Sequence, residues 1–206
     1  MDIFEDESLF GFAQIDSDLA ERESCKCALV TLVSYPNLEY RYNPNEYFMM
    51  KNELWKKHTE KMNRVKAFLD ANSVKYKTPP ATPKDDENYC AEFSYKWAAI
   101  HAGLGFIGKN DVFVHYKYAQ KVRISCLLLD LDVPVFNGVI SSKCSSCDLC
   151  VKACPYKYIS GRTWHIDIHR DELIDYKKCA AKTKVSYDGK GYACGYCVMA
   201  CKYPEI

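Results

Sequence analysis

Two dense runs of cysteine near the C-terminal end constrain this chain more than any other feature of its sequence. Together with one cysteine between them, they account for eight of the twelve cysteines in 206 residues. The first run has the spacing Cys144-x2-Cys147-x2-Cys150-x3-Cys154 and is followed by Pro155, and the second has the spacing Cys194-x2-Cys197-x3-Cys201, with Cys179 upstream. Thiolates at such short intervals favour a metal site, and their spacing indicates which metal.

Three kinds of cysteine site compete. A disulfide scaffold suits a short secreted chain, but the acidic start from Met1 to Glu7 lacks the basic region and apolar run of a signal peptide. We therefore expect a cytoplasmic protein. Zinc sites usually contain two separated Cys-x-x-Cys pairs per metal, whereas iron–sulfur clusters favour a denser run with a proline after its last cysteine. The dense runs favour iron and sulfide, with zinc as the alternative.

The first run has the spacing of two-cluster bacterial ferredoxins, in which the fourth cysteine binds the other cluster. Three cysteines at three-residue intervals let one loop reach three corners of a 4Fe–4S cubane, and the fourth lies about one helical turn further on. By this crossing rule, one cluster is predicted to be held by Cys144, Cys147, Cys150 and Cys201. The other is predicted to be held by Cys154, Cys179, Cys194 and Cys197.

The cysteine distribution also predicts two domains. Residues 1–140 contain only Cys25, Cys27, Cys90 and Cys126, which we interpret mainly as small buried hydrophobes. The boundary is expected near Asn137-Gly138, between a body of residues 1–140 and a ferredoxin-like module of residues 141–206 that binds two 4Fe–4S clusters.

Local patterns give the body an α+β fold. A strand is expected over 25–35, helices over 46–74 and 91–102, and a hairpin of strands over 112–116 and 121–131. The longer helix is predicted to bury one stripe of Phe48, Trp55, Met62, Val65 and Leu69. No apolar stretch approaches the ~20 residues that span a bilayer, and a net charge of +1 gives no electrostatic argument for nucleic acid.

A glycine-rich segment lies within the body, between the second expected helix and the expected hairpin. Gly103, Gly105 and Gly108 fit the pattern G-x-G-x-x-G, but a helix precedes them and strands follow, which is the reverse of a dinucleotide-binding fold. The segment from Lys96 to Asn110, with AGLGFIGKN at its end, resembles the AGLGxIGKN segment of the epoxyqueuosine reductase family. Arg123, on the strand after it, and the cysteine module follow in that family's order. The resemblance covers nearly the whole chain.

The resemblance implies a cobalamin-dependent iron–sulfur reductase. Cobalamin would lie in an α/β cobalamin-binding-type body, with electrons passing through the clusters to cobalt. The substrate would be a small electrophile, epoxyqueuosine in tRNA or an analogue, and the electron donor a reduced ferredoxin or flavodoxin. The predicted cobalamin-binding residues are Asn88, Gly103, Gly105, Gly108, Lys109, Asn110 and Arg123. Glycines let backbone approach a bulky ligand closely, and the last three side chains offer donors; otherwise they are solvated charges at a helix end.

Two departures from the family bear on the substrate. Asn88 stands where the family has its catalytic aspartate, and an amide does not titrate near neutral pH. Tyr89 is therefore the predicted proton donor. The chain stops five residues after Cys201, so the C-terminal repeat domain that helps hold tRNA in the family is not expected. The alternative function is a ferredoxin-like electron-transfer protein with a partner-docking domain and no corrinoid, or a subunit that supplies electrons to a tRNA-modifying assembly.

Overall fold

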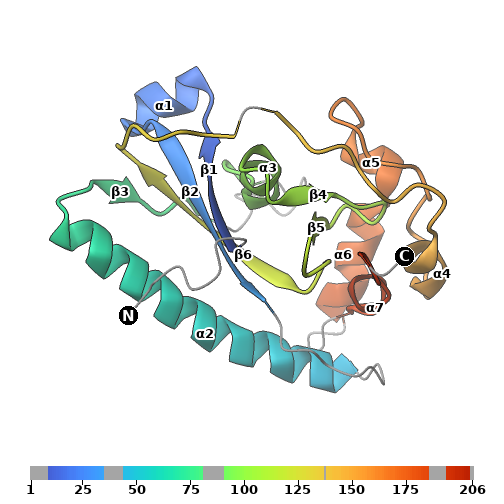
Figure 1. Ribbon diagram of the computed structural model, residues 1–206. Coiled ribbons are helices and arrows are strands. Elements are labelled where there is room, and N and C mark those ends of the chain that lie inside the picture. The colour runs from blue at the N-terminus through green and yellow to red at the C-terminus, as the bar shows by residue number, and fades with distance from the viewer. Residues whose placement is uncertain (1–8, 35–43, 81–90, 137, 186–193, 205–206) are drawn as a thin grey trace. The chain divides into compact units, whose positions relative to one another are not determined.

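The computed structural model describes residues 9–34, 44–80, 91–136, 138–185 and 194–204. Over these residues the chain has the mixed α+β composition that the sequence predicts (Figure 1). The strands are β1 Phe10–Gln14, β2 Cys27–Ser34, β3 Tyr76–Lys77, β4 Gly105–Ile107, β5 Phe113–His115 and β6 Val122–Leu129. The helices are α1 Ser17–Glu23, α2 Pro44–Ala71, α3 Tyr95–His101, α4 Leu149–Ala153, α5 Arg170–Leu173, α6 Tyr176–Val185 and α7 Tyr196–Met199.

The chain divides into two compact units. The sheet unit comprises residues 1–34, 56–105 and 123–140, and the cysteine unit comprises residues 35–55, 106–122 and 141–206. The last division, after residue 140, lies close to the boundary expected from the cysteine distribution. The cysteine unit also takes two segments from the predicted body, and the assignment of 1–140 and 141–206 as separate domains stays a prediction.

The sheet unit is built on a four-stranded sheet in the order β1-β2-β6-β3. Strand β1 is antiparallel to β2, with Phe10 opposite Thr31, and β3 is antiparallel to β6. The residues of β2 are buried almost throughout, because helices cover both faces of this strand and leave no side for solvent. The uninterrupted apolar run predicted this strand correctly.

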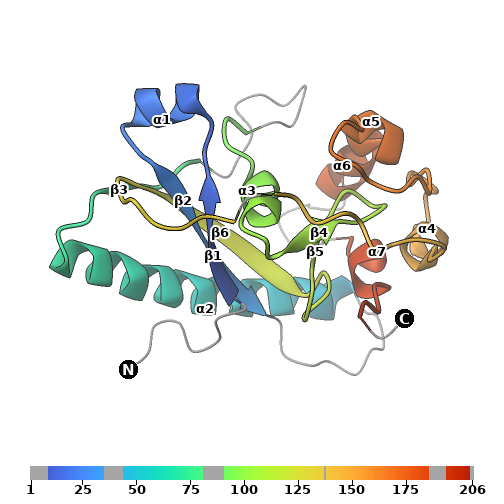
Figure 2. The same cartoon turned by 45° about the horizontal axis from the view of Figure 1, so that its top comes forward.

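The part of helix α2 that belongs to the sheet unit, residues 56–71, covers one face of this sheet (Figures 1 and 2). Met62, Val65 and Leu69 pack against alternate residues of β2 and β6, including Leu29 and Leu127. Alternate strand residues point to the same face of a sheet. The apolar side chains on that face of β2 and β6 therefore pack with the apolar side chains of α2 in one core.

Helix α3 packs against the strands β1 and β2. The approach is close at Gly11, where a Cβ atom would lie 2.9 Å from the carbonyl oxygen of Ala102. A side chain at this position would push the helix off the strand. The Ser94 side chain caps α3 by accepting a hydrogen bond from the Trp97 amide at 3.2 Å. This cap fixes the start of the helix at Tyr95.

Two expectations about the body are wrong. The strands β5 and β6 do not form a hairpin, because β5 pairs with β4 in a separate two-stranded sheet. The glycine-rich segment thus contributes a strand that the sequence did not predict. Trp55, which we placed on the buried stripe of α2, is 56% exposed, while Leu54 is buried. Phe48 lies outside the residues whose side chains are described.

The cysteine unit contains the four short helices α4 to α7 in its C-terminal part. Its apolar core is small and centres on Ile159, Leu173 and Ile174, against which several of the cysteines pack. Helices of four to ten residues are marginal alone in water, so their stability must come from this packing and from whatever the thiols bind. None of the described helices is both long and apolar enough to cross a membrane.

Candidate metal centres

The first cysteine run forms a tight turn that leads into α4. The Cys147 amide donates a hydrogen bond to the Cys144 carbonyl oxygen at 2.8 Å. Helix α4 begins after Asp148 and ends at Cys154, whose backbone is extended and leaves the helix. The amide of Tyr158 donates to the Cys154 Sγ at 3.4 Å. The fourth thiol of the run is therefore held separately from the first three.

Four thiols line one small cavity of the cysteine unit: those of Cys144, Cys147, Cys150 and Cys201. Three come from the first run and one from the second, as the crossing rule predicts. Burial, and then the thiols of Cys144, Cys197, Cys201 and Cys147, raise the pKa of the Cys150 thiol to about 12. The cavity is therefore poor at stabilising thiolates by itself, and a cationic metal centre would supply the missing positive charge.

The remaining four thiols form a second group. Burial raises the pKa of the Cys179 thiol to about 11, and the thiols of Cys197, Cys194 and Cys154 act on it in the same direction. Cys154, Cys179 and Cys197 pack against the core of Ile159, Leu173 and Ile174. The eight C-terminal thiols thus lie near one another in the cysteine unit, and Cys197 also acts on Cys150 of the first group. Their division into two ligand sets of four stays a prediction.

The described residues do not meet the requirements of a site for a single metal ion. Among the described residues, no three His, Cys, Asp or Glu side chains lie close enough together to hold one metal ion. The other cysteines of the described segments lie in the sheet unit, where Cys25, Cys27 and Cys126 are buried. Burial raises the pKa of all three thiols. They behave as small hydrophobes, and Cys90 lies outside the described residues.

Lys109 and Asn110 lie in the cysteine unit with the thiols. Lys109 is only 5% exposed, and its Nζ is 2.7 Å from the Asp148 Oδ1 inside the first cysteine run. This ammonium holds the pKa of the Asp148 carboxyl below its ordinary value. Asn110 is buried and exchanges two hydrogen bonds with Gln120. No spacing in the sequence points to Asp148 or Gln120, because both contacts join segments that are distant or irregular.

The glycines of the segment are required by packing within the chain. Gly103 has a φ of +70°, and a Cβ atom there would lie 2.8 Å from the Phe136 ring. At Gly108 a Cβ atom would lie 3.0 Å from both the Asn110 Oδ1 and the Gln120 Nε2. Gly105 is buried in β4. Packing within the chain therefore accounts for glycine at positions 103 and 108, and the binding of cobalamin by Gly103, Gly105 and Gly108 stays a prediction.

The other predicted site residues divide between the described and undescribed parts of the chain. Arg123 lies on β6 in the sheet unit, partly buried and close enough to His58 to lower its pKa. Asn88 and Tyr89 both lie in the segment 81–90, outside the described residues, so their roles stay predictions.

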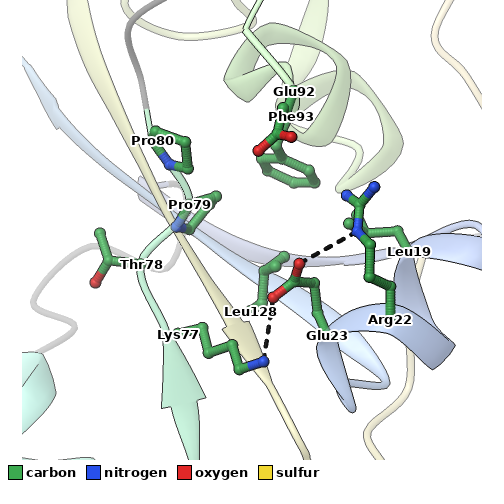
Figure 3. Close-up of a pocket in the computed structure, with 10 residues that line it drawn as sticks. All are labelled: Leu19, Arg22, Glu23, Lys77, Thr78, Pro79, Pro80, Glu92, Phe93 and Leu128. Carbon is green, nitrogen blue, oxygen red and sulfur yellow. Dashed lines mark hydrogen bonds and ion pairs between the residues drawn. The ribbon is translucent and has the colours of Figure 1, made fainter. Parts of the chain in front are cut away.

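The sheet unit contains a cavity of about 360 Å³ (Figure 3), within the ~300–1,000 Å³ typical of small-molecule sites. Leu19, Phe93 and Leu128 supply apolar lining. Glu23 lies at its edge between two cations, 3.1 Å from the Lys77 Nζ and 3.3 Å from the Arg22 Nε. Lys77, followed by Arg22, lowers the pKa of Glu23. A cavity with an apolar lining and charged groups at its edge suits a ligand that has both apolar and polar or charged parts.

A neighbouring hollow of about 390 Å³ shares Arg22 and Phe93 with this cavity and extends to Trp97. Trp97 stacks on the ring of His101, with the ring centroids 3.9 Å apart. The His101 Nε2 is buried and has no hydrogen-bond partner in the described part of the chain. Burial also lowers the pKa of His101, which favours a neutral ring. The sequence analysis did not single out this nitrogen.

Comparison with known proteins by sequence points to one kind of enzyme. No protein-family model matches the chain. An epoxyqueuosine reductase of Leadbetterella byssophila is 28% identical over 113 residues, which cover 52% of the chain and 35% of the relative. An epoxyqueuosine reductase of Lactococcus garvieae is 39% identical over 67 residues, which cover 31% of the chain and 18% of the relative. The matches span about a third or less of these relatives.

Comparison by structure extends the similarity to nearly the whole chain. An epoxyqueuosine reductase from Streptococcus thermophilus has a TM-score of 0.58 at 17% identity, over 96% of the chain and 62% of that protein. One crystallised with an epoxyqueuosine-modified tRNA stem loop has a TM-score of 0.60 at 16% identity, over 94% and 60%. A reductive dehalogenase whose structure suggests a mechanism for B12-dependent dehalogenation has a TM-score of 0.63 at 17% identity, over 86% and 25%. At these identities the likeness is one of fold.

Proposed function

Because the chain is related in sequence to the epoxyqueuosine reductases, we propose that it is an iron–sulfur reductase of that kind. It binds two 4Fe–4S clusters in the cysteine unit. It uses their electrons, with cobalamin, to reduce a small electrophile, epoxyqueuosine in tRNA or an analogue. The observation that carries the proposal is the cavity lined by Cys144, Cys147, Cys150 and Cys201, which brings thiols of both cysteine runs together.

The donor set of each proposed centre fits a cluster. The first is held by Cys144, Cys147, Cys150 and Cys201, and the second by Cys154, Cys179, Cys194 and Cys197. Thiolates are the usual ligands of iron–sulfur clusters. Burial raises the pKa of the Cys150 and Cys179 thiols, so their ionisation is coupled to metal binding, which is typical of small metal-dependent modules. When bound, the clusters supply one-electron transfer.

Cobalamin is proposed on the similarity of fold to B12-dependent enzymes. It would supply a centre that accepts two electrons. Lys109 and Asn110 each use part of their hydrogen-bonding capacity within the chain, so as proposed cobalamin ligands they would offer their remaining donors. In the sheet unit, the two hollows and the unpartnered His101 Nε2 are the described features that a bound molecule would satisfy. We propose Tyr89 as the proton donor, with Asn88 beside it.

The partners follow from the same relationship. A reduced ferredoxin or flavodoxin is the proposed electron donor, and a tRNA stem loop is a proposed substrate carrier, as in the complex of the similar enzyme. We propose the cytoplasm as the site of action, where such a tRNA would be modified.

A second candidate function is an electron carrier that binds both clusters and no corrinoid. The observation that favours it is that residues of the glycine-rich segment make their contacts within the chain. Gly103 and Gly108 are fixed by contacts within the chain, and Lys109 and Asn110 are bonded to their own neighbours. In this case the body would dock a partner oxidoreductase.

One experiment separates the two functions. The protein is produced without oxygen in the presence of cobalamin, and iron, sulfide, zinc and cobalt are measured per chain. The reductase predicts about eight irons and one cobalt, together with turnover of an epoxyqueuosine-modified stem loop that falls sharply in Tyr89→Phe. Full iron without cobalt or turnover supports the electron carrier. Zinc in place of iron contradicts both.

A further inference from the structure

Helix α6 concentrates positive charge in the cysteine unit. Its ten residues include four lysines and no acidic residue. Lys177, Lys178 and Lys182 are exposed. Cys179 lies on the same helix, next to Lys178 and one turn before Lys182, and residues three or four positions apart are neighbours on a helix surface. Exposed cations therefore flank a cysteine that is predicted to bind the second cluster.

The segment that follows Cys154 lies against this helix. The Lys182 Nζ lies 5.6 Å from the centre of the Tyr156 ring. The amide of Asp175, which immediately precedes the helix, donates a hydrogen bond to the Tyr158 carbonyl oxygen at 2.9 Å. The Tyr158 amide in turn donates to the Cys154 Sγ at 3.4 Å. Helix α6 is thus in direct contact with the segment that leaves another predicted ligand of the same cluster.

The same segment adds one more cation. Lys157 follows Tyr156 in the chain and is exposed. The acidic neighbour is Asp175, whose Oδ2 lies 2.7 Å from the Lys178 Nζ and offsets one of the positive charges. A net positive charge remains on this surface. We refer to it as the lysine face, which consists of Lys157, Lys177, Lys178 and Lys182.

The charge of a cluster explains why a donor protein would need such a surface. A 4Fe–4S cluster with four thiolates carries a charge of about −2 when it is oxidised. An acidic donor protein is repelled by this charge. Cations at the surface offset the repulsion and raise the rate at which an acidic partner is captured in the right orientation. The lysine face lies on the two segments that carry Cys154 and Cys179, where this effect would act on the second cluster.

RNA is the other kind of polyanion that lysines attract. A protein that delivers an electron must come close to a cluster, whereas an RNA has no need to lie beside the cluster ligands. The position of the lysine face on the segments of Cys154 and Cys179 therefore favours an electron-carrying protein. Encounters of this kind need only a small interface, often below about 1,200 Å².

On this basis we propose that the lysine face is the docking surface for an acidic one-electron carrier protein, and that the electron enters at the second cluster. In this step the carrier is oxidised by one electron, the cluster is reduced by one, and no bond forms or breaks. The inference rests on the proposed function, since it needs the second cluster to be present. It adds the surface that receives the donor and the cluster that is reduced first.

The test is stopped-flow reduction of the oxidised, reconstituted holoprotein by a reduced, acidic flavodoxin. In the double variant Lys178→Gln, Lys182→Gln the second-order rate constant should fall about tenfold at low ionic strength. The difference should vanish near about 1 M salt, where the Debye length is ~3 Å. The matched variant Lys178→Arg, Lys182→Arg keeps both charges and should keep the rate.

Two controls separate docking from other effects. Reduced methyl viologen is a small cation that needs no docking surface, so its rate of reducing the clusters should not fall in any variant. The double variant Lys56→Gln, Lys57→Gln removes two exposed lysines of α2 in the sheet unit and should leave the flavodoxin rate unchanged. If the α6 variant fails to retain its second cluster, Lys157→Gln, which lies outside the helix, is measured instead and should also slow the flavodoxin reaction.

The outcomes distinguish this inference from the proposed function. A wild-type protein without two clusters would overturn both. Two clusters together with an unchanged flavodoxin rate in the lysine variants would overturn the docking surface alone. Equal slowing with methyl viologen would do the same, because the substitutions would then act on the cluster itself. Weaker binding of a tRNA stem loop at an unchanged flavodoxin rate would show that the lysine face binds RNA instead.

Discussion

His58 should make the sheet unit less stable in mild acid. Its ring is 8% exposed, and the Nε2 makes a hydrogen bond with the Ser125 hydroxyl on β6. Burial, and then the charges of Arg123 and Lys61, lower the pKa of His58 from 6.5 to about 4. The folded protein therefore keeps this ring neutral at a pH where the unfolded chain already binds a proton.

The sign and size follow from this difference. Between pH 6.5 and pH 4 the unfolded state holds more protons at this residue, so the free energy of unfolding falls as the pH falls. From the two pKa values, the loss is about 2 kcal/mol at pH 5 and approaches about 3 kcal/mol near pH 4. Above pH 7 the contribution is complete and no longer changes.

The assay is urea unfolding of the holoprotein without oxygen at pH 7.5 and pH 5, for the wild type and His58→Gln. The loss of unfolding free energy between the two pH values should be about 2 kcal/mol larger in the wild type, because glutamine does not titrate. Ser125→Ala keeps the buried ring and should keep the pH dependence. Equal losses in the wild type and His58→Gln would refute the reasoning.

Four other substitutions have definite expected outcomes. Lys109→Gln should make the potential of the cluster bound by Cys144 more negative, since it removes a buried cation beside the first cysteine run. Asp148→Asn removes the negative partner and should make that potential less negative. Redox titration measures both variants, and shifts of the same sign would contradict the role of the ion pair. Gly103→Ala should lower the free energy of unfolding by about 2–4 kcal/mol, because alanine is strained at positive φ and its Cβ would meet a ring, and an unchanged melting temperature would count against this contact. Cys126→Ala should leave the iron content unchanged, and loss of iron would show that the ligand set is misassigned.

Patterns of local chemistry were predictable from the sequence. The apolar run of β2 and the helical spacing of Met62, Val65 and Leu69 predicted elements whose cores depend on residues close in the chain. The cysteine spacing predicted that Cys201 of the second run lies beside Cys144, Cys147 and Cys150 of the first, because the reach of a short loop and one helical turn limits where these thiols can point. These features follow from geometry over a few residues.

Features that depend on distant partners were not predictable in the same way. Strands β5 and β6 are adjacent in sequence and have suitable residues, but β6 lies between the distant strands β2 and β3 and leaves β5 to pair with β4. Trp55 fits the helical stripe by spacing and is nevertheless exposed, because the stripe does not continue along the whole of α2. Lys109 was expected to serve a cofactor, and its burial against Asp148 joins positions 39 residues apart. Charge and polarity alone do not identify such partners.

The most direct test of the account is the crossing of the two cysteine runs. Each of Cys144, Cys154, Cys179 and Cys201 is replaced by alanine, and iron and the electron paramagnetic resonance spectrum of the reduced, reconstituted protein are measured. The account predicts about four irons per chain in each variant. Cys154→Ala and Cys179→Ala should leave the same remaining spectrum, and Cys144→Ala and Cys201→Ala should leave the other. A spectrum of Cys154→Ala that matches Cys144→Ala would contradict the crossed arrangement, and zinc in place of iron would contradict the clusters themselves.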